Sequence, residues 1–346
     1  MAKCIFRDNK IVSDYGRPYI ISEVNSSHNG DIELAKKMID ASVDIGCDCV
    51  KFQSWTVSSL YSKTYYDDNP IAKRFVTTFS LTSEQLKELS KYCNDKGIAF
   101  ASTPYSKEEV DFLIEECNVP FIKIASMEIN NYDILEYIGK KGIPVVLSTG
   151  MASEDEIVKA VSILEKTGPK QMVILHCVSI YPTELTTVNI NNILGLREKF
   201  KKYPIGFSDH TEGDAASVAA TTLGAAVIEK HLTLDKTKIG MDNGMATEPK
   251  EFSELVTKCR NIQVALGTKE RIVSEQELEQ RKKMRRSLVS TRDIHKGEII
   301  TVNDLCAKRP GTGISPDKKE YIIGKEAIEE IPKDTVIKLN QINEGE

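Results

Sequence analysis

Two histidines each end an apolar, strand-like stretch: GFSDH ends at His210 and VIEKH ends at His231. The chain has only five histidines in 346 residues, so their placement at successive strand ends needs an explanation. Imidazole nitrogens bind Zn, Mn, Fe or Co, and water or substrate fills the remaining positions. We therefore predict that His210 and His231 hold one divalent metal ion. The alternative is a pair of hydrogen-bonded core histidines.

Two lysines, Lys51 and Lys123, lie in the similar stretches CVKFQ and FIKIAS. A buried ammonium group must be paired, be neutral or hold an anion. Hydroxyl side chains stand near the ends of neighbouring stretches: Thr103, Ser126, Ser148 and Ser208. Together they suit a phosphorylated, carboxylated ligand. Two alternatives stay open: a Schiff-base lysine, for which a metal would be redundant, and salt bridges to Glu23 or Glu128.

The elements that must position these residues alternate along the chain. Short apolar runs rich in β-branched residues occupy 19–24, 49–53, 98–104, 121–126, 144–150, 172–178, 204–210 and 225–232. Helical patterns separate them; one starts at Asp31, with Leu34, Met38, Ala41 and Ile45 on one face, and another starts with a capping box at Thr82. Such alternation implies parallel strands. Eight units match an α/β fold, the (β/α)8 TIM barrel. An open doubly wound sheet is the alternative, but no GxGxxG motif supports it.

In such a barrel the carboxyl ends of the strands build the active site. Every predicted strand carries polar residues there: Glu23; Lys51 and Gln53; Thr103; Lys123, Ser126 and Glu128; Ser148; His176, Ser179 and Tyr181; Ser208, Asp209 and His210; Glu229 and His231. Because side chains alternate along a strand, Lys51 shares a face with Gln53, Ser208 with His210, and Glu229 with His231.

The sequence also indicates a second domain. We expect the barrel over 1–266, a charged, partly helical linker over 267–286, and a small, mainly β domain over 287–346 with KGE and PGTG turns. A domain of about 60 residues is marginal alone, so we expect it to lean on a neighbour. The long connection over 54–81 is either a lid or a surface excursion packed by its own aromatic residues.

Composition excludes several classes of protein. The net charge of −5, with lysines and acids interspersed, argues against nucleic-acid binding. No apolar run approaches 18 residues, and MAKCIFRDNK lacks the apolar centre of a signal peptide, so we expect no membrane contact. The eight cysteines form no CxxC pair, which is typical of reduced thiols in a cytoplasmic protein.

The strand-end stretches, in this order, resemble the sialic acid synthase family. The matching ones are SEVNSSHNGD, VKFQ, ASTPYS, FIKIASMEINN, VVLSTGM, LHCVSIYPT, GFSDHT, VIEKHLTLDKT and DNGMATEP. The segment DIHKGEII…LCAKRPGTGI resembles the antifreeze-like (SAF) domain of these synthases. The resemblance spans nearly the whole chain. It implies condensation of phosphoenolpyruvate with an N-acetylated hexose, such as N-acetylmannosamine or a 6-deoxy diacetamido analogue, with release of phosphate.

The resemblance also implies roles for individual residues. The metal at His210 and His231 would be Mn, with Mg or Co as alternatives. Phosphoenolpyruvate contacts would come from Lys51, Thr103, Lys123, Ser126, Ser148, Ser179 and Ser208. Sugar contacts would come from Glu23, Gln53, Tyr181 and Asp242. We expect Glu23, Glu128, Lys51 and Lys123 to act in catalysis, with Glu128 orienting water or accepting a proton. Arg309 would reach into the site of a partner subunit, which implies a domain-swapped homodimer.

Some positions depart from the family pattern. Asn243 follows Asp242 where many members have histidine, and MAT at 245–247 replaces a common serine. Asn25 and Ser27 stand where glycine and asparagine are frequent. We expect these positions near the sugar, so the acceptor stays open between precursors of neuraminic, legionaminic and pseudaminic acids. A metal-dependent pyruvate aldolase on the same barrel and a non-catalytic sugar-binding protein are the alternative functions.

Overall fold

The computed structural model describes residues 1–168 and 171–343, and it divides into two units, Met1–Gly267 and Thr268–Glu346. The division falls one residue beyond the barrel range expected from the sequence. Residues 268–286 group with the second unit, because Gly311 donates its N–H to the Lys282 carbonyl at 2.8 Å. The expected linker is therefore partly an element of the small unit.

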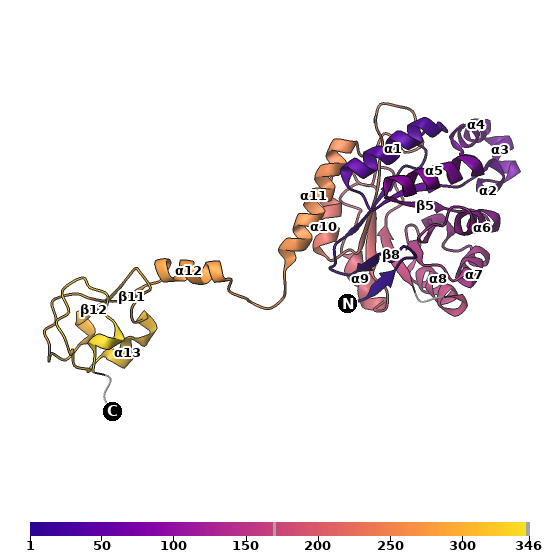
Figure 1. Ribbon diagram of the computed structural model, residues 1–346. Coiled ribbons are helices and arrows are strands. Elements are labelled where there is room, and N and C mark those ends of the chain that lie inside the picture. The colour runs from indigo at the N-terminus through magenta and orange to yellow at the C-terminus, as the bar shows by residue number, and fades with distance from the viewer. Residues whose placement is uncertain (169–170, 344–346) are drawn as a thin grey trace. The chain divides into compact units, whose positions relative to one another are not determined.

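The first unit is a barrel of eight parallel strands, as predicted (Figure 1). The strands are β3 (Tyr19–Glu23), β4 (Cys49–Gln53), β5 (Ala99–Thr103), β6 (Ile122–Ile124), β7 (Val145–Ser148), β8 (Met172–Cys177), β9 (Ile205–Asp209) and β10 (Val227–His231). Their order is β5-β4-β3-β10-β9-β8-β7-β6. Glu23 stands opposite Lys51 on one side and His231 on the other. The register therefore brings these three strand ends to one level.

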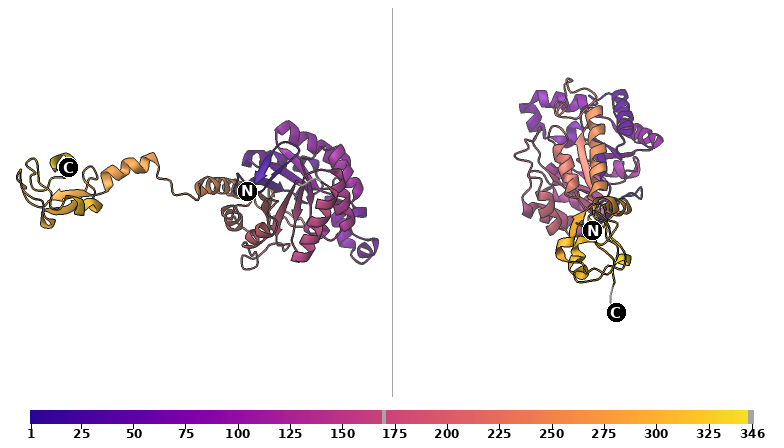
Figure 2. Two further views of the ribbon diagram at one scale, coloured as in Figure 1. Left: turned by 90° about the horizontal axis from the view of Figure 1, so that it is seen from below. Right: turned by 90° about the vertical axis from the view of Figure 1, so that its left-hand side faces the viewer.

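Helices surround the strands (Figure 2). They are α1 (Ile32–Ile45), α5 (Ser83–Lys96), α6 (Lys107–Glu115), α7 (Tyr132–Lys141), α8 (Glu154–Thr167), α9 (Asn192–Lys199), α10 (Ala215–Thr222) and α11 (Pro249–Leu266). The Asp31 side chain caps α1, and Thr82 with Gln85 forms the predicted capping box on α5. Gly97 ends α5 at φ 75°, a left-handed conformation that glycine adopts without strain.

The buried face of α1 differs from the predicted one. It consists of Ala35, Met38, Ile39, Ser42 and Ile45, whereas Leu34 and Ala41 are only partly buried. The difference arises from Ser42, whose hydroxyl lies 2.8 Å from that of Ser22 on β3 and donates to the Met38 carbonyl. The polar Ser42 is therefore part of the buried face of α1, and its hydroxyl has hydrogen-bond partners there.

A hairpin that the sequence did not predict closes one end of the barrel. Strands β1 (Lys3–Ile5) and β2 (Ile11–Ser13) pair antiparallel. Phe6, between them, packs against Tyr19 and Phe121, with ring centroids 5.2 Å and 4.6 Å away. Cys4, Phe6 and Val12 join the apolar cluster inside the barrel. Because Tyr19 starts β3, the hairpin covers the amino end of the strands and leaves the carboxyl end for a site.

The long connection after β4 contains three helices, α2 (Val57–Leu60), α3 (Lys63–Asp68) and α4 (Pro70–Phe79). Trp55, Tyr66 and Val76 form a separate apolar cluster with Tyr105, and Val57 and Leu60 pack against it. The segment is therefore packed by its own aromatic residues, as one of the two interpretations expected. Trp55, Leu60 and Tyr61 also line the cavity described below.

The second unit has a core of its own. It contains α12 (Glu275–Met284), the antiparallel strands β11 (Ser287–Ser290) and β12 (Leu305–Lys308), and the short α13 (Lys319–Ile322). Buried aliphatic residues fill its centre, including Leu288, Ile294, Ile300, Ile322, Ile331 and Ile337. Within the described parts of both units, no helix is long and apolar enough to cross a membrane.

Candidate active site

The carboxyl ends of the barrel strands enclose a cavity of about 250 Å³. Fourteen of the strand-end and site residues expected from the sequence line it: Glu23, Lys51, Gln53, Thr103, Lys123, Ser126, Ser148, Ser179, Tyr181, Ser208, His210, Glu229, His231 and Asp242. They come from all eight strands and the loops that follow them. Each predicted pair on a common strand face, such as Glu229 with His231, lines the cavity together.

Two lysines and two carboxylates lie close together in this site. The Lys51 ammonium contacts the Glu23 carboxylate, donates to Thr103 Oγ1 at 3.1 Å, and lies 3.9 Å from Glu229 Oε2. The Lys123 ammonium donates to Ser148 Oγ at 2.6 Å and lies 3.8 Å from Glu229 Oε1. Salt bridging is therefore present, but Lys123 has Glu229 as its partner rather than Glu128.

Burial and charge shift the pKa values of these groups in different directions. Burial raises the pKa of Glu23, and Lys51 only partly offsets this. Burial also opposes ionisation of Glu229, but Lys123 and Lys51 outweigh it and lower its pKa to about 2. Burial lowers the pKa of Lys123, despite the attraction of Glu229. Glu229 is thus the fixed negative charge between the two lysines, and a bound anion would favour the charged form of Lys123.

The rings of His210 and His231 lie next to each other in the wall of the cavity. Their ring centroids are 5.2 Å apart, with 63° between the ring planes. His210 Nδ1 lies 2.7 Å from the Val178 carbonyl, and His231 Nδ1 contacts the Asp242 carboxylate. Each ring therefore uses Nδ1 for a neighbouring oxygen, so the neutral form of each ring has its proton on Nδ1 and its lone pair on Nε2.

This arrangement fits a divalent ion. An ion about 2.1 Å from each nitrogen sets two imidazole centroids about 5 Å apart. A carboxylate or carbonyl on the second nitrogen is the usual support for a metal-binding histidine. No group of three or more histidine, cysteine or acidic side chains in the described part of the chain is arranged to hold a metal. The protein would therefore supply two ligands here, and water or substrate the others.

One predicted site residue of the barrel unit, Glu128, does not line the cavity. Glu128 ends the short 3-10 turn Ser126–Glu128, and its carboxylate accepts from the Asn131 amide at 2.8 Å. Because that turn redirects the chain after β6, Ser126 lines the cavity and Glu128 does not, so the expected catalytic role of Glu128 has no contact to support it. Arg309, a further predicted site residue, belongs to the second unit.

Two strand-end residues face away from the cavity. His176 Nε2 lies 2.7 Å from the Val188 carbonyl, and its ring stacks on Phe207. Asp209 accepts from Lys230 Nζ at 2.9 Å and from Ser217 Oγ at 2.6 Å. Both occupy the strand face that packs against helices. Their neighbours Cys177 and Ser208 line the cavity instead.

The sequence analysis missed several cavity residues, among them Trp55, Tyr105 and Cys177. Strand alternation from Ser179 would have selected Cys177 over His176. Burial raises the pKa of the Cys177 thiol, but the effect of His210, whose Nδ1 lies 3.9 Å from Cys177 Sγ, is larger. The pKa of this thiol is therefore lowered to about 7. Trp55 and Tyr105 each lie two residues beyond a strand end, and no periodicity extends there.

Of the positions that depart from the family pattern, only Asn25 lines the cavity. It has φ 35°, a left-handed value that asparagine tolerates better than most residues, and its amide donates to Asp242 Oδ2 at 2.7 Å. Asn243 instead binds its own loop, donating to the Asp235 and Lys238 carbonyls at 2.8 Å each. The expectation that all these positions approach the sugar is therefore supported only for Asn25.

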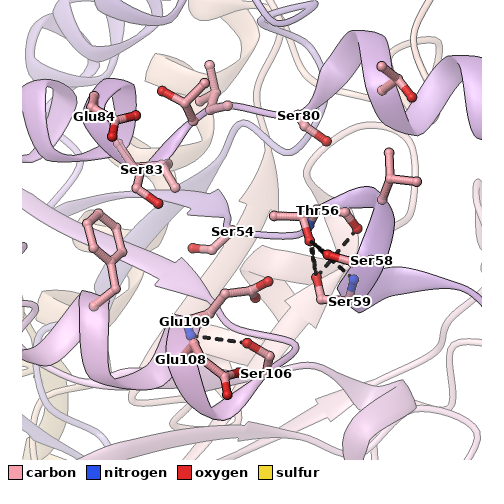
Figure 3. A pocket seen from close by; sticks show the side chains of 16 residues that line it. Ser54, Thr56, Ser58, Ser59, Ser80, Ser83, Glu84, Ser106, Glu108 and Glu109 are labelled. Carbon is pink, nitrogen blue, oxygen red and sulfur yellow. Dashed lines mark hydrogen bonds between the residues drawn. The ribbon is translucent and has the colours of Figure 1, made fainter.

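A larger hollow of about 850 Å³ lies beside the helices α2, α5 and α6 (Figure 3). Hydroxyl residues dominate its wall, including Ser54, Thr56, Ser58, Ser59, Ser80, Ser83 and Ser106. Its charged residues are Glu84, Glu108 and Glu109, and no lysine, arginine or histidine is among the residues that line it. Such a wall repels an anion, so the smaller cavity in the barrel is the candidate site.

The fold and the site define a (β/α)8-barrel protein with a charged, histidine-containing cavity at the carboxyl ends of its strands, joined to a small β-containing unit. The chain belongs to the NeuB family, whose model matches residues 38–271, and a SAF domain matches residues 285–343. This confirms the resemblance to the sialic acid, legionaminic acid and pseudaminic acid synthases.

Individual relatives cover most of the chain. The N,N'-diacetyllegionaminic acid synthase of Campylobacter jejuni is 39% identical over 330 residues, which cover 92% of this chain and 98% of that protein. The N-acetylneuraminate-9-phosphate synthase of Homo sapiens is 34% identical, covering 92% of this chain and 91% of that protein. A crystal structure of N-acetylneuraminic acid synthetase from Leptospira borgpetersenii, in complex with citrate, has a TM-score of 0.73 and 33% identity, covering 81% of this chain and 96% of that chain.

Proposed function

We propose that this protein condenses phosphoenolpyruvate with an N-acetylated hexose, forms a nine-carbon 2-keto-3-deoxy acid and releases phosphate. One observation carries the proposal. The cavity joins a half that contains the ammonium groups of Lys51 and Lys123 to a half where His210 and His231 each direct Nδ1 to a neighbouring oxygen, so that the lone pair of each neutral ring is on Nε2. An anionic donor and an aldehyde acceptor need these two halves side by side.

The half that contains the two ammonium groups suits phosphoenolpyruvate. Lys51 and Lys123 supply positive charge, and the hydroxyls of Thr103, Ser148 and Ser208 already lie within hydrogen-bond distance of a charged group of the site. Thr103 and Ser148 accept from the lysines, so their own O–H groups and the two ammonium groups can donate to a phosphate or a carboxylate, whereas Ser208 donates to Glu229. Ser126 and Ser179, on the Cys177 side of the cavity, extend the same wall.

The other half suits the sugar. Glu23, Gln53, Tyr181 and Asp242 offer carboxylate, amide and phenol groups to hydroxyls and to the acetamido group. Tyr181 stacks its ring 4.2 Å from that of His210, which places its phenol beside the histidines. A divalent ion at His210 and His231, Mn first and Mg or Co as alternatives, supplies Lewis-acid polarisation of the open-chain aldehyde when bound.

The reaction balances with these parts. C3 of phosphoenolpyruvate forms a bond to the aldehyde carbon, whose oxygen takes up a proton. C2 becomes cationic and accepts water, whose oxygen becomes the keto oxygen when the C2–O bond to phosphate breaks. Of the two protons of this water, one balances the proton taken up by the aldehyde oxygen and the other leaves with phosphate. The residues of the chain hold the two substrates in register and stabilise the charge that develops, which is the larger part of such catalysis.

The proposed reaction and the identity of its acceptor sugar can be tested in one experiment. We would incubate the protein with phosphoenolpyruvate, Mn²⁺ and either N-acetylmannosamine or a 6-deoxy diacetamido hexose, then measure phosphate and the product mass. The proposal expects phosphate only when an acceptor is present. Aldol addition of pyruvate without phosphate release would favour the aldolase alternative, and binding without any turnover would favour a sugar-binding protein.

A further inference from the structure

Tyr105 lies beside Gln53 in the half of the cavity assigned to the acceptor, and the proposed reaction does not use it. It is the second residue after β5, it is 8% exposed, and it lines the cavity. Its hydroxyl donates to Gln53 Oε1 at 2.6 Å. On the other side of the same amide, Gln53 Nε2 donates to Glu23 Oε1 at 3.1 Å. The two bonds together fix which end of the Gln53 amide points to which neighbour.

This fixed orientation decides what Gln53 offers to a ligand. An amide has two N–H donors and two acceptor lone pairs. One donor is used on Glu23 and one lone pair on Tyr105, so one of each stays free on a side chain that is only partly buried. Without the Tyr105 hydroxyl, the amide loses one of its two restraints and can turn away from the pose that the ligand meets.

Tyr105 is itself held in place from two sides. Its backbone N–H donates to Glu109 Oε2 at 2.6 Å, in the first turn of α6. Its ring packs against Trp55, with centroids 6.3 Å apart, in the aromatic cluster of the long connection after β4. The phenol therefore has little freedom to follow Gln53 if that amide moves.

We propose that Tyr105 is a positioning residue for the acceptor sugar, acting by orienting the Gln53 amide toward it. The inference rests on the proposed function, because it assigns Gln53 to the sugar rather than to phosphoenolpyruvate. It predicts an effect on one substrate only. A merely structural tyrosine would alter stability, or the use of both substrates alike.

The test is Tyr105→Phe in the full-length protein, because it keeps the ring and its packing and removes one hydroxyl. We expect KM for the acceptor to rise roughly tenfold, the cost of one buried hydrogen bond, while KM for phosphoenolpyruvate stays within about twofold. The matched control is Tyr66→Phe. Tyr66 belongs to the same cluster and is 4% exposed, and its hydroxyl has no hydrogen-bond partner in the described part of the chain. That variant should leave both KM values unchanged.

A double-mutant cycle shows whether Tyr105 acts through Gln53. In a Gln53→Met background, Tyr105→Phe should change the acceptor KM by less than about twofold, because the amide that it orients is gone. Full additivity of the two effects would overturn the inference. An equal rise in both KM values for Tyr105→Phe alone would do the same.

A binding measurement keeps this test separate from that of the function. Trp55 is the single tryptophan of the chain and lines the cavity, so its fluorescence can report binding of N-acetylmannosamine or the diacetamido hexose. If the wild type is active and Tyr105→Phe leaves the acceptor KM and Kd unchanged, only the role of Tyr105 is wrong. If the wild type neither binds nor converts either sugar, the proposed function and this inference are both wrong.

Discussion

At the scale of single residues, the two ring nitrogens of each site histidine have different roles. Nδ1 of His210 and His231 contacts a carbonyl and a carboxylate, and Nε2 is left for another partner. The Glu229 carboxylate lies within 4 Å of the ammonium groups of both Lys51 and Lys123, and their positive charge keeps it ionised. These local pairings decide which groups are free to meet a ligand.

We expect His231→Ala to lower kcat/KM by at least about a thousandfold and to abolish Mn²⁺ binding, because one of two protein ligands is lost. Metal content after dialysis and phosphate release would be measured together. The control is His176→Gln, which changes a buried histidine that faces away from the cavity. A His231→Ala variant that still binds one equivalent of Mn²⁺ would contradict the metal assignment.

We expect the protein to become less stable at acid pH, because His28 binds a proton more readily in the unfolded chain than in the folded one. Burial lowers its pKa to about 4 from the ordinary value near 6.5. Between these values the unfolded state binds more protons than the folded state, so the free energy of unfolding decreases as the pH falls through this window. Lowering the pH from 7.5 to 5.5 should cost about 1 kcal/mol through this residue.

Urea unfolding of the barrel, followed by Trp55 fluorescence, measures this pH dependence. His28→Gln is the control because it removes the titrating ring, so its unfolding free energy should depend less on pH. An identical pH dependence in both proteins would show that His28 does not contribute.

At the scale of elements, alternation along the strands separates two sets of charges. On β9 and β10, Ser208 and Glu229 line the cavity, whereas Asp209 and Lys230 form a fully buried pair on the opposite face. Lys230 also donates to the Thr211 carbonyl at 2.8 Å, and Asp209 accepts from Ser217 in α10. The pair therefore joins two strands, a loop and a helix directly behind the site.

We expect Lys230→Met to destabilise the barrel by about 3–5 kcal/mol, because it leaves the Asp209 carboxylate buried without its cation. The double variant Asp209→Asn, Lys230→Met should lose much less, since no uncompensated charge remains. Unfolding free energies from urea titrations would be compared. A single variant as stable as the wild type would show that the pair is not needed behind the site.

At the scale of the whole molecule, the chain has two units with separate cores. The barrel holds every residue that lines the candidate cavity, whereas Arg309 is in the second unit. A role for Arg309 in sugar binding therefore requires the second unit of the same or another chain to approach the cavity. We propose the domain-swapped homodimer that the family resemblance implies, in which that residue would enter the partner's site.

Subunit complementation tests this arrangement. Arg309→Ala and His231→Ala should each be nearly inactive alone, but their co-expressed mixture should regain roughly a quarter of wild-type activity. Half of randomly formed dimers are mixed, and each of these has one intact site of two. Recovery requires that Arg309 acts across the dimer. A mixture as inactive as its components would place Arg309 in its own subunit's site, and an Arg309→Ala variant that is active alone would place Arg309 outside any site.

Much of the fold and site followed from local patterns. Strand and helix alternation predicted the barrel, and the helix caps at Asp31 and Thr82 were confirmed. The hairpin at 3–13 was missed because two strands of three residues carry too little periodicity to register. His176 was listed with the other strand-end residues without a face, because β8 is buried on both faces and such strands show no alternation of apolar and polar residues.

The sequence by itself determined which residue types stand at the strand ends and which of them share a face, because strand alternation is a local property of the backbone. Only the tertiary structure decided that Lys123 meets Glu229, that Glu128 turns away, and that Tyr105 reaches Gln53. These contacts depend on the register between strands distant in the chain and on turns beyond the strand ends, where no periodic pattern constrains the direction of a side chain.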